Sequence, residues 1–295
     1  AECYIGVTVR APRKSVFNGS GDAFVAKVNA AGTAIVYAGF VGGAGSDGGG
    51  SIAVDQNGNA CFAGGTSSAE LSFPVKVGPD LTFNGAHDLT TWWNSDGFVA
   101  KINPAGTALV YSGYIGGAEI DSIRGLAIDE TGIAFVAGFT YSTESSFPVI
   151  AGPDLTFNGN HSADHGWNYD GFVAKVNVAG TALVYAGYIG GIEQEYVTAL
   201  AVDGTGNAYV AGTTYSSETS FPVKDGPDLT FNGGFNPAGY WDSDSFVAKV
   251  SPAGSALVFA GYIGGLANDS VSGIAVDGTG NAFVAGTTSS PQASF

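Results

Sequence analysis

The chain has 295 residues, of which 45% are hydrophobic, 12% aromatic and 12% charged, and 47 are glycine. This length allows one large domain or two ordinary ones with buried cores, while the aromatic content and the lack of a glycine triplet exclude a disordered chain and a collagen. Twenty-six acidic against ten basic residues give a net charge of −16, so nucleic acids and anionic membrane surfaces are poor candidate partners.

The first twenty residues differ from the rest of the chain. A predicted strand over residues 3–9 is followed by a basic cluster that holds three of the ten basic residues. These residues are Cys3, Tyr4, Ile5, Val7 and Val9 in the strand, and Arg10, Arg13 and Lys14 in the cluster. Because the chain starts at Ala1 and contains no Met, we expect an exported protein whose secretory signal has been removed.

From residue 21 onward the sequence repeats every 74 residues. The tetrapeptide Phe-Val-Ala-Lys begins at Phe24, Phe98, Phe172 and Phe246. Two further runs, exemplified by ALVYAGYIGG from Ala182 and GIAVDGTGNAFVAGTT from Gly273, recur with the same spacing. Four units would need 296 residues, so the repeat occupies nearly the whole chain and its two ends meet almost in phase.

Each unit contains four short apolar runs separated by Gly, Asn, Asp and Pro, which predicts four strands joined by tight turns. In the third unit the runs are 200–202, 208–212, 246–250 and 256–263, and the Asp-Gly-Thr-Gly sequence at 203–206 is typical of a hairpin turn. Several runs lack polar and apolar alternation, so both faces of the sheets should be covered. We predict an all-β fold, a four-bladed β-propeller.

Three blocks carry a resemblance to a known family: Asp-[Gly/Ala/Ser]-Phe-Val-Ala-Lys, Ala-Leu-Val-Tyr with Tyr-Ile-Gly-Gly, and Gly-Ile-Ala-Val-Asp with Gly-Asn-Ala. These blocks resemble the bacterial beta-propeller repeat (SBBP) family, in four copies over about two thirds of the chain. The resemblance implies a propeller on a secreted or surface-exposed bacterial protein, and it implies no activity. The chain departs from the family pattern by a long insert in each unit, and the common family ring has more blades than four copies give.

The repeat also predicts where the blades lie. If the Gly-Ile-Ala-Val run is the innermost strand, three blades span roughly 51–117, 125–191 and 199–265. The fourth is composite, because 273–295 must pair with 22–43, so that N- and C-terminal strands close the ring in one sheet. We therefore divide the chain into an N-terminal arm, residues 1–20, and a propeller, residues 21–295. The alternative is an eight-bladed ring closed by two chains.

Three inserts share Phe-Pro-Val followed by Gly-Pro-Asp-Leu-Thr-Phe-Asn-Gly, and loops on a rigid scaffold often carry function. Aromatic faces beside Asp and Asn could bind sugar rings, and the candidate residues for this lectin site are Trp93, Trp167 and Trp241. Oxygen ligands could instead hold calcium, and the candidates are Asp80, Asp154 and Asp228, although their spacing matches no EF-hand. The simpler interpretation is that the aromatic rings fill gaps between blades while Asp and Asn form turns.

The two cysteines suggest one disulfide in an exported protein. Cys61 replaces the aromatic residue that the other repeats carry, and Cys3 is the one other cysteine. The bond could lie within or between chains, and two buried thiols are the alternative. The arm could likewise fold back onto its own ring or add as a strand to a neighbouring subunit.

We expect a non-enzymatic, secreted structural protein, because no nucleophile elbow, phosphate loop or dinucleotide fingerprint occurs. The predicted assembly is a homo-oligomer or filament, forming an extracellular fibre or surface layer on a bacterium or other prokaryote through the N-terminal strand. The alternative function is a carbohydrate-binding propeller with a glycan partner. We expect no cofactor other than possible calcium, no nucleic acid and no membrane insertion.

Overall fold

The computed structural model describes residues 19–85, 94–159, 161–162, 166–235 and 241–295. Throughout these residues the secondary structure consists of antiparallel β-strands joined by turns and loops, which confirms the all-β prediction. In this part of the chain no helix has the length and apolar character needed to cross a membrane.

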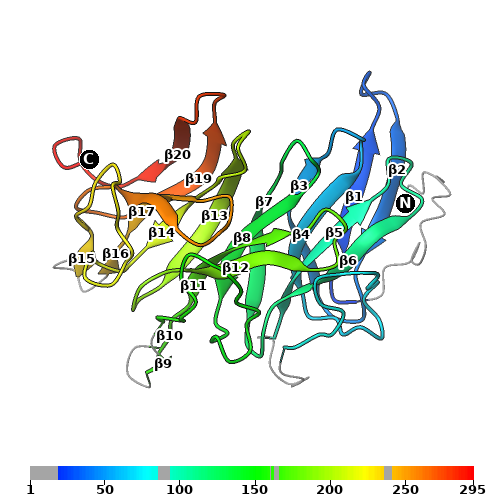
Figure 1. Ribbon diagram of the computed structural model, residues 1–295, viewed down its shortest axis with the longest axis horizontal. Helices are drawn as coiled ribbons and strands as arrows, with labels where there is room; N and C mark the ends of the chain where they lie inside the picture. Colours follow the sequence, from blue (N-terminus) through cyan, green and yellow to red (C-terminus); the bar gives the residue numbers. More distant parts are fainter. Residues whose placement is uncertain (1–18, 86–93, 160, 163–165, 236–240) are drawn as a thin grey trace, which may run out of the picture.

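Twelve strands form three antiparallel four-stranded sheets, here called blades 1 to 3 (Figure 1). Blade 1 contains β3 (Asp47–Val54), β4 (Ala60–Thr66), β5 (Asp96–Ile102) and β6 (Leu109–Ile115). Blade 2 contains β7 (Asp121–Ile128), β8 (Ala134–Thr140), β11 (Asp170–Val176) and β12 (Leu183–Ile189). Blade 3 contains β13 (Glu195–Val202), β14 (Ala208–Thr214), β17 (Asp244–Val250) and β18 (Leu257–Ile263). In each blade the strands pair in chain order.

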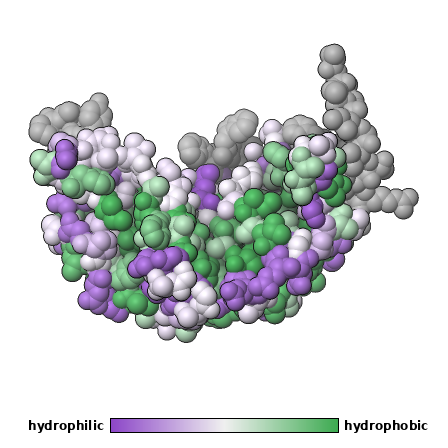
Figure 2. Space-filling model, turned by 90° about the horizontal axis from the view of Figure 1, so that it is seen from above, coloured by the Kyte–Doolittle hydropathy of each residue, from purple (hydrophilic) through white to green (hydrophobic). Residues whose placement is uncertain are grey.

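Two further sheets have two strands each and lie at opposite ends of the row of blades (Figure 1). The N-terminal half-blade pairs β1 (Ala23–Val28) with β2 (Ile35–Val41), and the C-terminal half-blade pairs β19 (Asp269–Val276) with β20 (Ala282–Thr288). The sixteen blade strands are consistent with a four-bladed propeller. The closed ring is not confirmed, because β1 and β20 belong to separate sheets. The blades instead form an arc whose hollow side is visible in Figure 2.

Two short hairpins lie in the inserts. In blade 2, β9 (His161–Ser162) pairs with β10 (Gly166–Trp167), and in blade 3, β15 (Gly234–Phe235) pairs with β16 (Trp241–Asp242). Each insert leaves the second strand of its blade and returns to the third, so it lies outside the four-stranded sheet itself.

The turn between the first two strands of a blade depends on an Asp and a Gly. In blade 3, Asp203 Oδ1 accepts hydrogen bonds from the N–H groups of Thr205 and Asn207, both at 3.0 Å. Gly206 has a φ of 83°, which glycine adopts without the steric penalty of a side chain. The Asp-Gly-Thr-Gly sequence therefore forms the hairpin turn that it predicted.

Each main hydrophobic cluster is shared by neighbouring blades. One cluster joins Val99 and Tyr111 of blade 1 to Leu126 and Phe172 of blade 2, and the next repeats this arrangement between blades 2 and 3. Blade 2 is thus covered on both faces, and strands β8 and β11 have almost no exposed residues. This two-sided burial explains why these strands lack polar and apolar alternation.

Candidate assembly interface

The insert of each blade covers the outer edge of the fourth strand. In blade 1, Ser112 of β6 donates its N–H to the Lys76 carbonyl at 2.7 Å, and Lys76 donates back to the Ser112 carbonyl at 2.8 Å. The Tyr114 N–H donates to the Asp80 carbonyl at 2.8 Å. Equivalent bonds protect the outer edges of blades 2 and 3. Paired edges of this kind are not available for pairing with another chain.

Each complete blade buries an aromatic trio in which the phenylalanine of the insert packs between two rings of the sheet. In blade 1, the Phe73 centroid lies 5.2 Å from that of Phe98 and 5.3 Å from that of Tyr114. The trios of blades 2 and 3 have nearly the same spacings, and they are Phe147 with Phe172 and Tyr188, and Phe221 with Phe246 and Tyr262. All nine rings are at most 2% exposed.

The fourth trio is divided between the two ends of the arc. At the 74-residue spacing, Phe295 corresponds to the insert phenylalanine, while Phe24 of β1 and Phe40 of β2 correspond to the two sheet rings. These three rings are 63%, 74% and 39% exposed, respectively. Their exposure follows from the separation of the half-blades, since each half holds part of a cluster that is buried in every complete blade.

A second repeated contact is also incomplete at the ends. Tyr37, Tyr111 and Tyr185 each lie against a turn glycine of the next blade, and these glycines are Gly106, Gly180 and Gly254. By the 74-residue spacing, the next pair in this series would be Phe259 of blade 3 with Gly32, in the turn between β1 and β2. A Cβ on Gly32 would meet nothing within 4 Å, and Phe259 remains partly exposed.

The edges of β20 and β1 are the counterparts of a strand pair that every complete blade contains. In every complete blade the second strand pairs with the third, as Ala60–Thr66 of β4 does with Asp96–Ile102 of β5. When the residue numbers of this pairing are shifted by multiples of 74, the same register would pair Ala282 with Val28 and Thr288 with Asp22. Apolar side chains remain exposed on both strands, including Phe283 on β20 and Val28 on β1. The two half-blades therefore present matching strand edges, one at each end of the arc.

The predicted assembly residues of the N-terminal arm lie outside the described residues. They are Cys3, Tyr4, Ile5, Val7, Val9, Arg10, Arg13 and Lys14. Cys61, the proposed disulfide partner of Cys3, is a free and fully buried thiol whose Sγ lies 3.2 Å from the Tyr111 hydroxyl. A thiol in this position has no access to another chain, so the structure gives no support to an intermolecular bond. A disulfide between Cys3 and Cys61 stays a prediction.

The predicted sugar-binding tryptophans fall largely outside the described side chains. Trp93 lies outside the described residues, and for Trp167 and Trp241 the structure describes the backbone position in β10 and β16. The lectin site therefore stays a prediction. Asp80 closes its own loop: Oδ1 accepts from the Thr82 N–H at 2.9 Å, and Oδ2 accepts from Asn84 Nδ2 at 2.7 Å.

The other two candidate calcium ligands, Asp154 and Asp228, make the same loop-closing hydrogen bonds. Among the described residues, no group of three or more His, Cys, Asp or Glu side chains is placed to hold a metal ion. Calcium binding by these residues stays a prediction, and their observed role is to form turns.

Pairs of buried carboxyl groups connect neighbouring blades. Asp96 of β5 and Asp121 of β7 are both fully buried, and both point to the space beside the Gly116 backbone. An added Cβ on Gly116 would lie 2.8 Å from Asp96 Oδ1 and 2.9 Å from Asp121 Oδ2. Asp121 Oδ2 accepts hydrogen bonds from the Gly117 N–H at 2.7 Å and from Ser142 Oγ at 3.0 Å.

Burial raises the pKa of Asp96 to about 8, with a further contribution from the negative charge of Asp121, and burial raises the pKa of Asp121 to about 7. Near neutral pH the pair therefore retains a proton. Equivalent pairs, Asp170 with Glu195 and Asp244 with Asp269, lie between the following blades. These pairs were not predicted from the sequence, although an acidic residue recurs at the first position of these strands.

The fold defines a beta-propeller repeat protein with three four-stranded blades and a two-stranded half-blade at each end of the row. Residues 184–218 and 258–291 match the family model described as a beta-propeller repeat (SBBP). The chain thus carries repeats of the family that its sequence resembles, and the two matched segments cover β13–β14 and β19–β20 with the preceding strands. The comparison with curated proteins gave no match.

Proposed function

We propose that this chain is a non-enzymatic, exported structural protein that self-assembles head to tail into an extracellular fibre or surface layer. The observation that carries the proposal is the divided aromatic trio, in which Phe295 at one end of the arc lacks the rings of Phe24 and Phe40 at the other. Assembly would place Phe295 of one copy between these two rings of the next copy.

Pairing between copies agrees better with the arc than pairing within one chain. The half-blades lie at opposite ends of the row, and four successive interfaces between neighbouring sheets hold them there (Figure 1). Joining the two ends of one chain would require these well-packed interfaces to change together. Joining two copies requires no change in any of them.

The joint would combine apolar burial with backbone pairing. Burying the exposed parts of the three rings, which are 63%, 74% and 39% exposed, contributes roughly 3–5 kcal/mol. Association itself opposes binding by about 4–15 kcal/mol, so the rings alone do not give a tight complex. The hydrogen bonds between β20 and β1 and the contact of Phe259 with Gly32 must add to them. The proposed joint supplies all three kinds of contact, because it repeats the strand pairing, the aromatic trio and the ring-to-glycine contact found in and between the complete blades.

The N-terminal arm would also contribute to this joint. At the 74-residue spacing, residues 2–6 correspond to residues 76–80. Residues 76–80 belong to the insert segment that covers the outer edge of blade 1. We propose that the arm covers the outer edge of β2 in the same way and so completes the fourth blade. The arm would then stabilise the joint from the side opposite β20.

Sedimentation velocity over a range of concentrations, with electron microscopy of the same samples, tests the proposal. Phe295→Ala should abolish association and leave the fold of the chain intact, because the side chain is exposed in the single chain. Leu71→Ala is the matched control, since Leu71 is also an exposed apolar residue but lies outside the joint. Deletion of residues 1–20 should weaken association.

The sizes of the particles identify the assembly. A continuous series of growing species supports the fibre, because a head-to-tail contact that does not close extends without limit. If the only associated species contains two chains, the assembly is the eight-bladed ring and not a fibre. A monomer at all concentrations would contradict self-assembly.

A further inference from the structure

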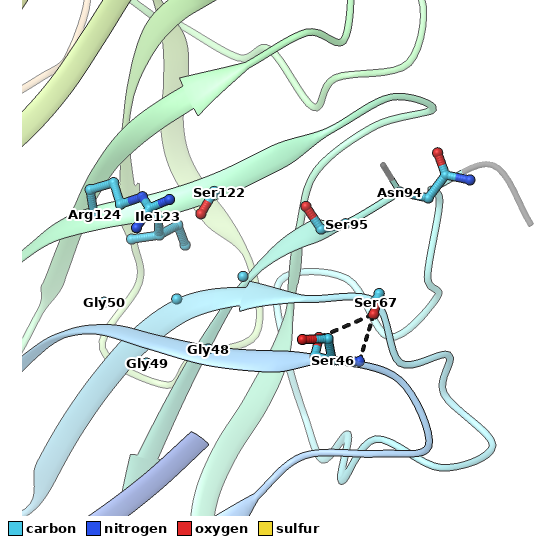
Figure 3. Close-up of a pocket in the computed structure, with 12 residues that line it drawn as sticks. Ser46, Gly48, Gly49, Gly50, Ser67, Asn94, Ser95, Ser122, Ile123 and Arg124 are labelled. Atoms are coloured by element: carbon cyan, nitrogen blue, oxygen red, sulfur yellow. Dashed lines mark hydrogen bonds between the residues drawn. The ribbon is translucent and has the colours of Figure 1, made fainter. Parts of the chain in front are cut away.

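A polar pocket of about 250 Å³ lies between blades 1 and 2, away from the proposed joint (Figure 3). One wall is β7, with Ser122, Ile123 and Arg124, and the facing wall is the glycine run 48–50 of β3. Ser95 and Asn94 lie beside these walls, at the approach to β5. The pocket is thus surrounded by hydroxyl groups, an amide and one guanidinium group.

The pocket lies where small residues occupy positions that hold aromatic rings at the next interface. At the next interface, between blades 2 and 3, four aromatic rings occupy the equivalent positions, and they are Phe139, Tyr141, Tyr169 and Tyr196. Their ring centroids lie 4.9 to 6.2 Å apart, so the rings fill that space. At the interface with the pocket, the same positions hold Gly65, Ser67, Ser95 and Ser122. Small residues therefore stand where the interface between blades 2 and 3 has a complete aromatic cluster.

The glycine run keeps the facing wall open. Position 50, equivalent to Arg124 in the next repeat, is glycine, and a Cβ added to Gly48 would meet nothing within 4 Å. The side-chain hydroxyl of Ser95 donates to the Asp121 carbonyl at 3.1 Å, which fixes the hydroxyl oxygen at the edge of the pocket. The hydroxyl of Ser67 is held by the backbone of Ser46.

Arg124 is the cation of this pocket. It stands at a β-bulge in β7, where the register shifts between Ile123 and Gly125, and its side chain is exposed. Its guanidinium carbon lies 5.6 Å from the ring centroid of Phe139 and 5.7 Å from that of Tyr196, so the aromatic rings hold the group in place. Among the described residues, no carboxylate oxygen lies within 4.0 Å of its nitrogens, although the chain has 26 acidic residues.

We propose that this pocket binds a hexuronate, a sugar unit with one carboxylate, and that Arg124 holds the carboxylate. The planar guanidinium group matches a carboxylate through two parallel hydrogen bonds. The hydroxyls of Ser95 and Ser122 suit the neutral hydroxyl groups of a sugar. The pocket volume of about 250 Å³ suits one sugar unit. Pockets for larger, drug-sized ligands usually measure about 300–1,000 Å³. A single cation in a chain of charge −16 favours a monovalent carboxylate over a phosphate dianion.

Isothermal titration of the full chain at low ionic strength tests this site. The probes are glucuronate and galacturonate, with glucose, acetate and inorganic phosphate as comparisons. A hexuronate should bind with saturation. Glucose and acetate should each bind at least tenfold more weakly, because glucose lacks the carboxylate and acetate lacks the sugar hydroxyls. Polygalacturonate in a second series distinguishes a free sugar from a unit within a polysaccharide.

Two variants and one matched control locate the binding site. Arg124→Gln should weaken hexuronate binding about tenfold or more, because it removes a charge-assisted pair of hydrogen bonds. Ser95→Tyr introduces the residue found at the equivalent position 169 and should fill the pocket. Ser243→Tyr makes the same change at the equivalent position of blade 3, and it should leave binding unchanged.

Several outcomes would overturn the proposal. They are the absence of saturable hexuronate binding, equal binding by the Arg124→Gln variant, or equal loss in the Ser95→Tyr and Ser243→Tyr variants. Tighter binding of phosphate than of either hexuronate would also contradict the assigned ligand class. Unchanged melting temperatures of the variants show that any loss of binding comes from the pocket and not from unfolding.

Discussion

Tyr111 of β6 lies directly against Gly180, in the turn between β11 and β12 of the next blade. A Cβ on Gly180 would fall 2.2 Å from the tyrosine ring, and the glycine has a φ of 74°. The contact joins two consecutive blades, and the same relationship recurs along the arc. At Gly32, which has a similar φ of 71°, the space beside the glycine is open.

These two glycines give a matched pair of variants. Gly32→Ala should lower the free energy of unfolding of the single chain by about 1–2 kcal/mol, the effect of a left-handed backbone conformation alone. Gly180→Ala should lower it by about 1–3 kcal/mol more, because the methyl group also overlaps the Tyr111 ring. Denaturant unfolding at low protein concentration measures both. Equal losses would show that the blade contact is not tightly packed.

Stability should decrease as the pH rises from about 5 to about 9. The raised pKa values of Asp96, about 8, and Asp121, about 7, mean that the folded chain binds more protons than the unfolded chain above pH 4. Protonated pairs contribute stability that is fully present below the unfolded pKa and lost as the pH rises through the folded pKa. Asp96→Asn should therefore raise the melting temperature at pH 9 and reduce the pH dependence between pH 5 and 9. A melting temperature that increases over this range would contradict the buried pairs.

The buried ion pair between Lys101 and Asp55 should stabilise blade 1. Lys101 Nζ lies 2.8 Å from Asp55 Oδ2, and both side chains are almost fully buried. Lys101→Met should lower the free energy of unfolding by about 3–5 kcal/mol at pH 7, because it leaves a buried carboxylate without its partner. Lys27→Met, at the equivalent exposed position of β1, should change it by less than about 0.5 kcal/mol.

The same ion pair has a defined pH range. Burial raises the pKa of Asp55, but the hydrogen bonds from Lys101 and Asn59 outweigh burial and lower this pKa to about 2. Its contribution is present above pH 4 and is lost as the pH falls from about 4 to about 2. The difference between wild type and Lys101→Met should therefore shrink over this acidic range. A constant difference would mean that packing of the lysine stem, and not its charge, is responsible.

Cys61 should react with a thiol reagent such as Ellman's reagent only after unfolding. Its side chain is fully buried, and burial raises the pKa of the thiol to about 11. In a Cys3→Ser variant at pH 8, we expect no reaction in the native state and one thiol in denaturant. Rapid reaction of the native variant would contradict the burial. In the wild-type chain, the absence of any thiol in denaturant without reductant would demonstrate the disulfide.

The repeat predicted the strands and turns because their signals are local. A hairpin such as that at Asp203 and Gly206 depends on residues within one turn, and the recurrence of Phe-Val-Ala-Lys at Phe98 and Phe172 sets the spacing of the third strands. Whether the ring closes could not be predicted in this way. The position of the ends depends on the packing angle at each of four interfaces, and these angles add along the arc.

The candidate interface was partly visible in the sequence. The 74-residue spacing by itself groups Phe295 with Phe24 and Phe40. That these rings are exposed became clear only from the positions of the half-blades in the structure. Predicting the pocket at Arg124 would have required a comparison of equivalent positions in the repeats. Ser95 is informative only because the equivalent residue of the next repeat is Tyr169. In both cases the information lies in contacts between repeats, which a scan along the chain does not register.

Cross-linking between two variants tests the proposed joint most directly. In chains that carry Cys3→Ser and Cys61→Ala, Ala23→Cys is introduced into one chain and Thr287→Cys into another. These positions pair if β20 joins β1 in the register of the complete blades, and such pairs have Cα separations suited to a disulfide. Mixing the two variants under mild oxidation should give cross-linked dimers that contain one chain of each kind. If the mixture gives none, while a single chain carrying both cysteines closes on itself, the fourth blade forms within one chain and assembly through this joint is wrong.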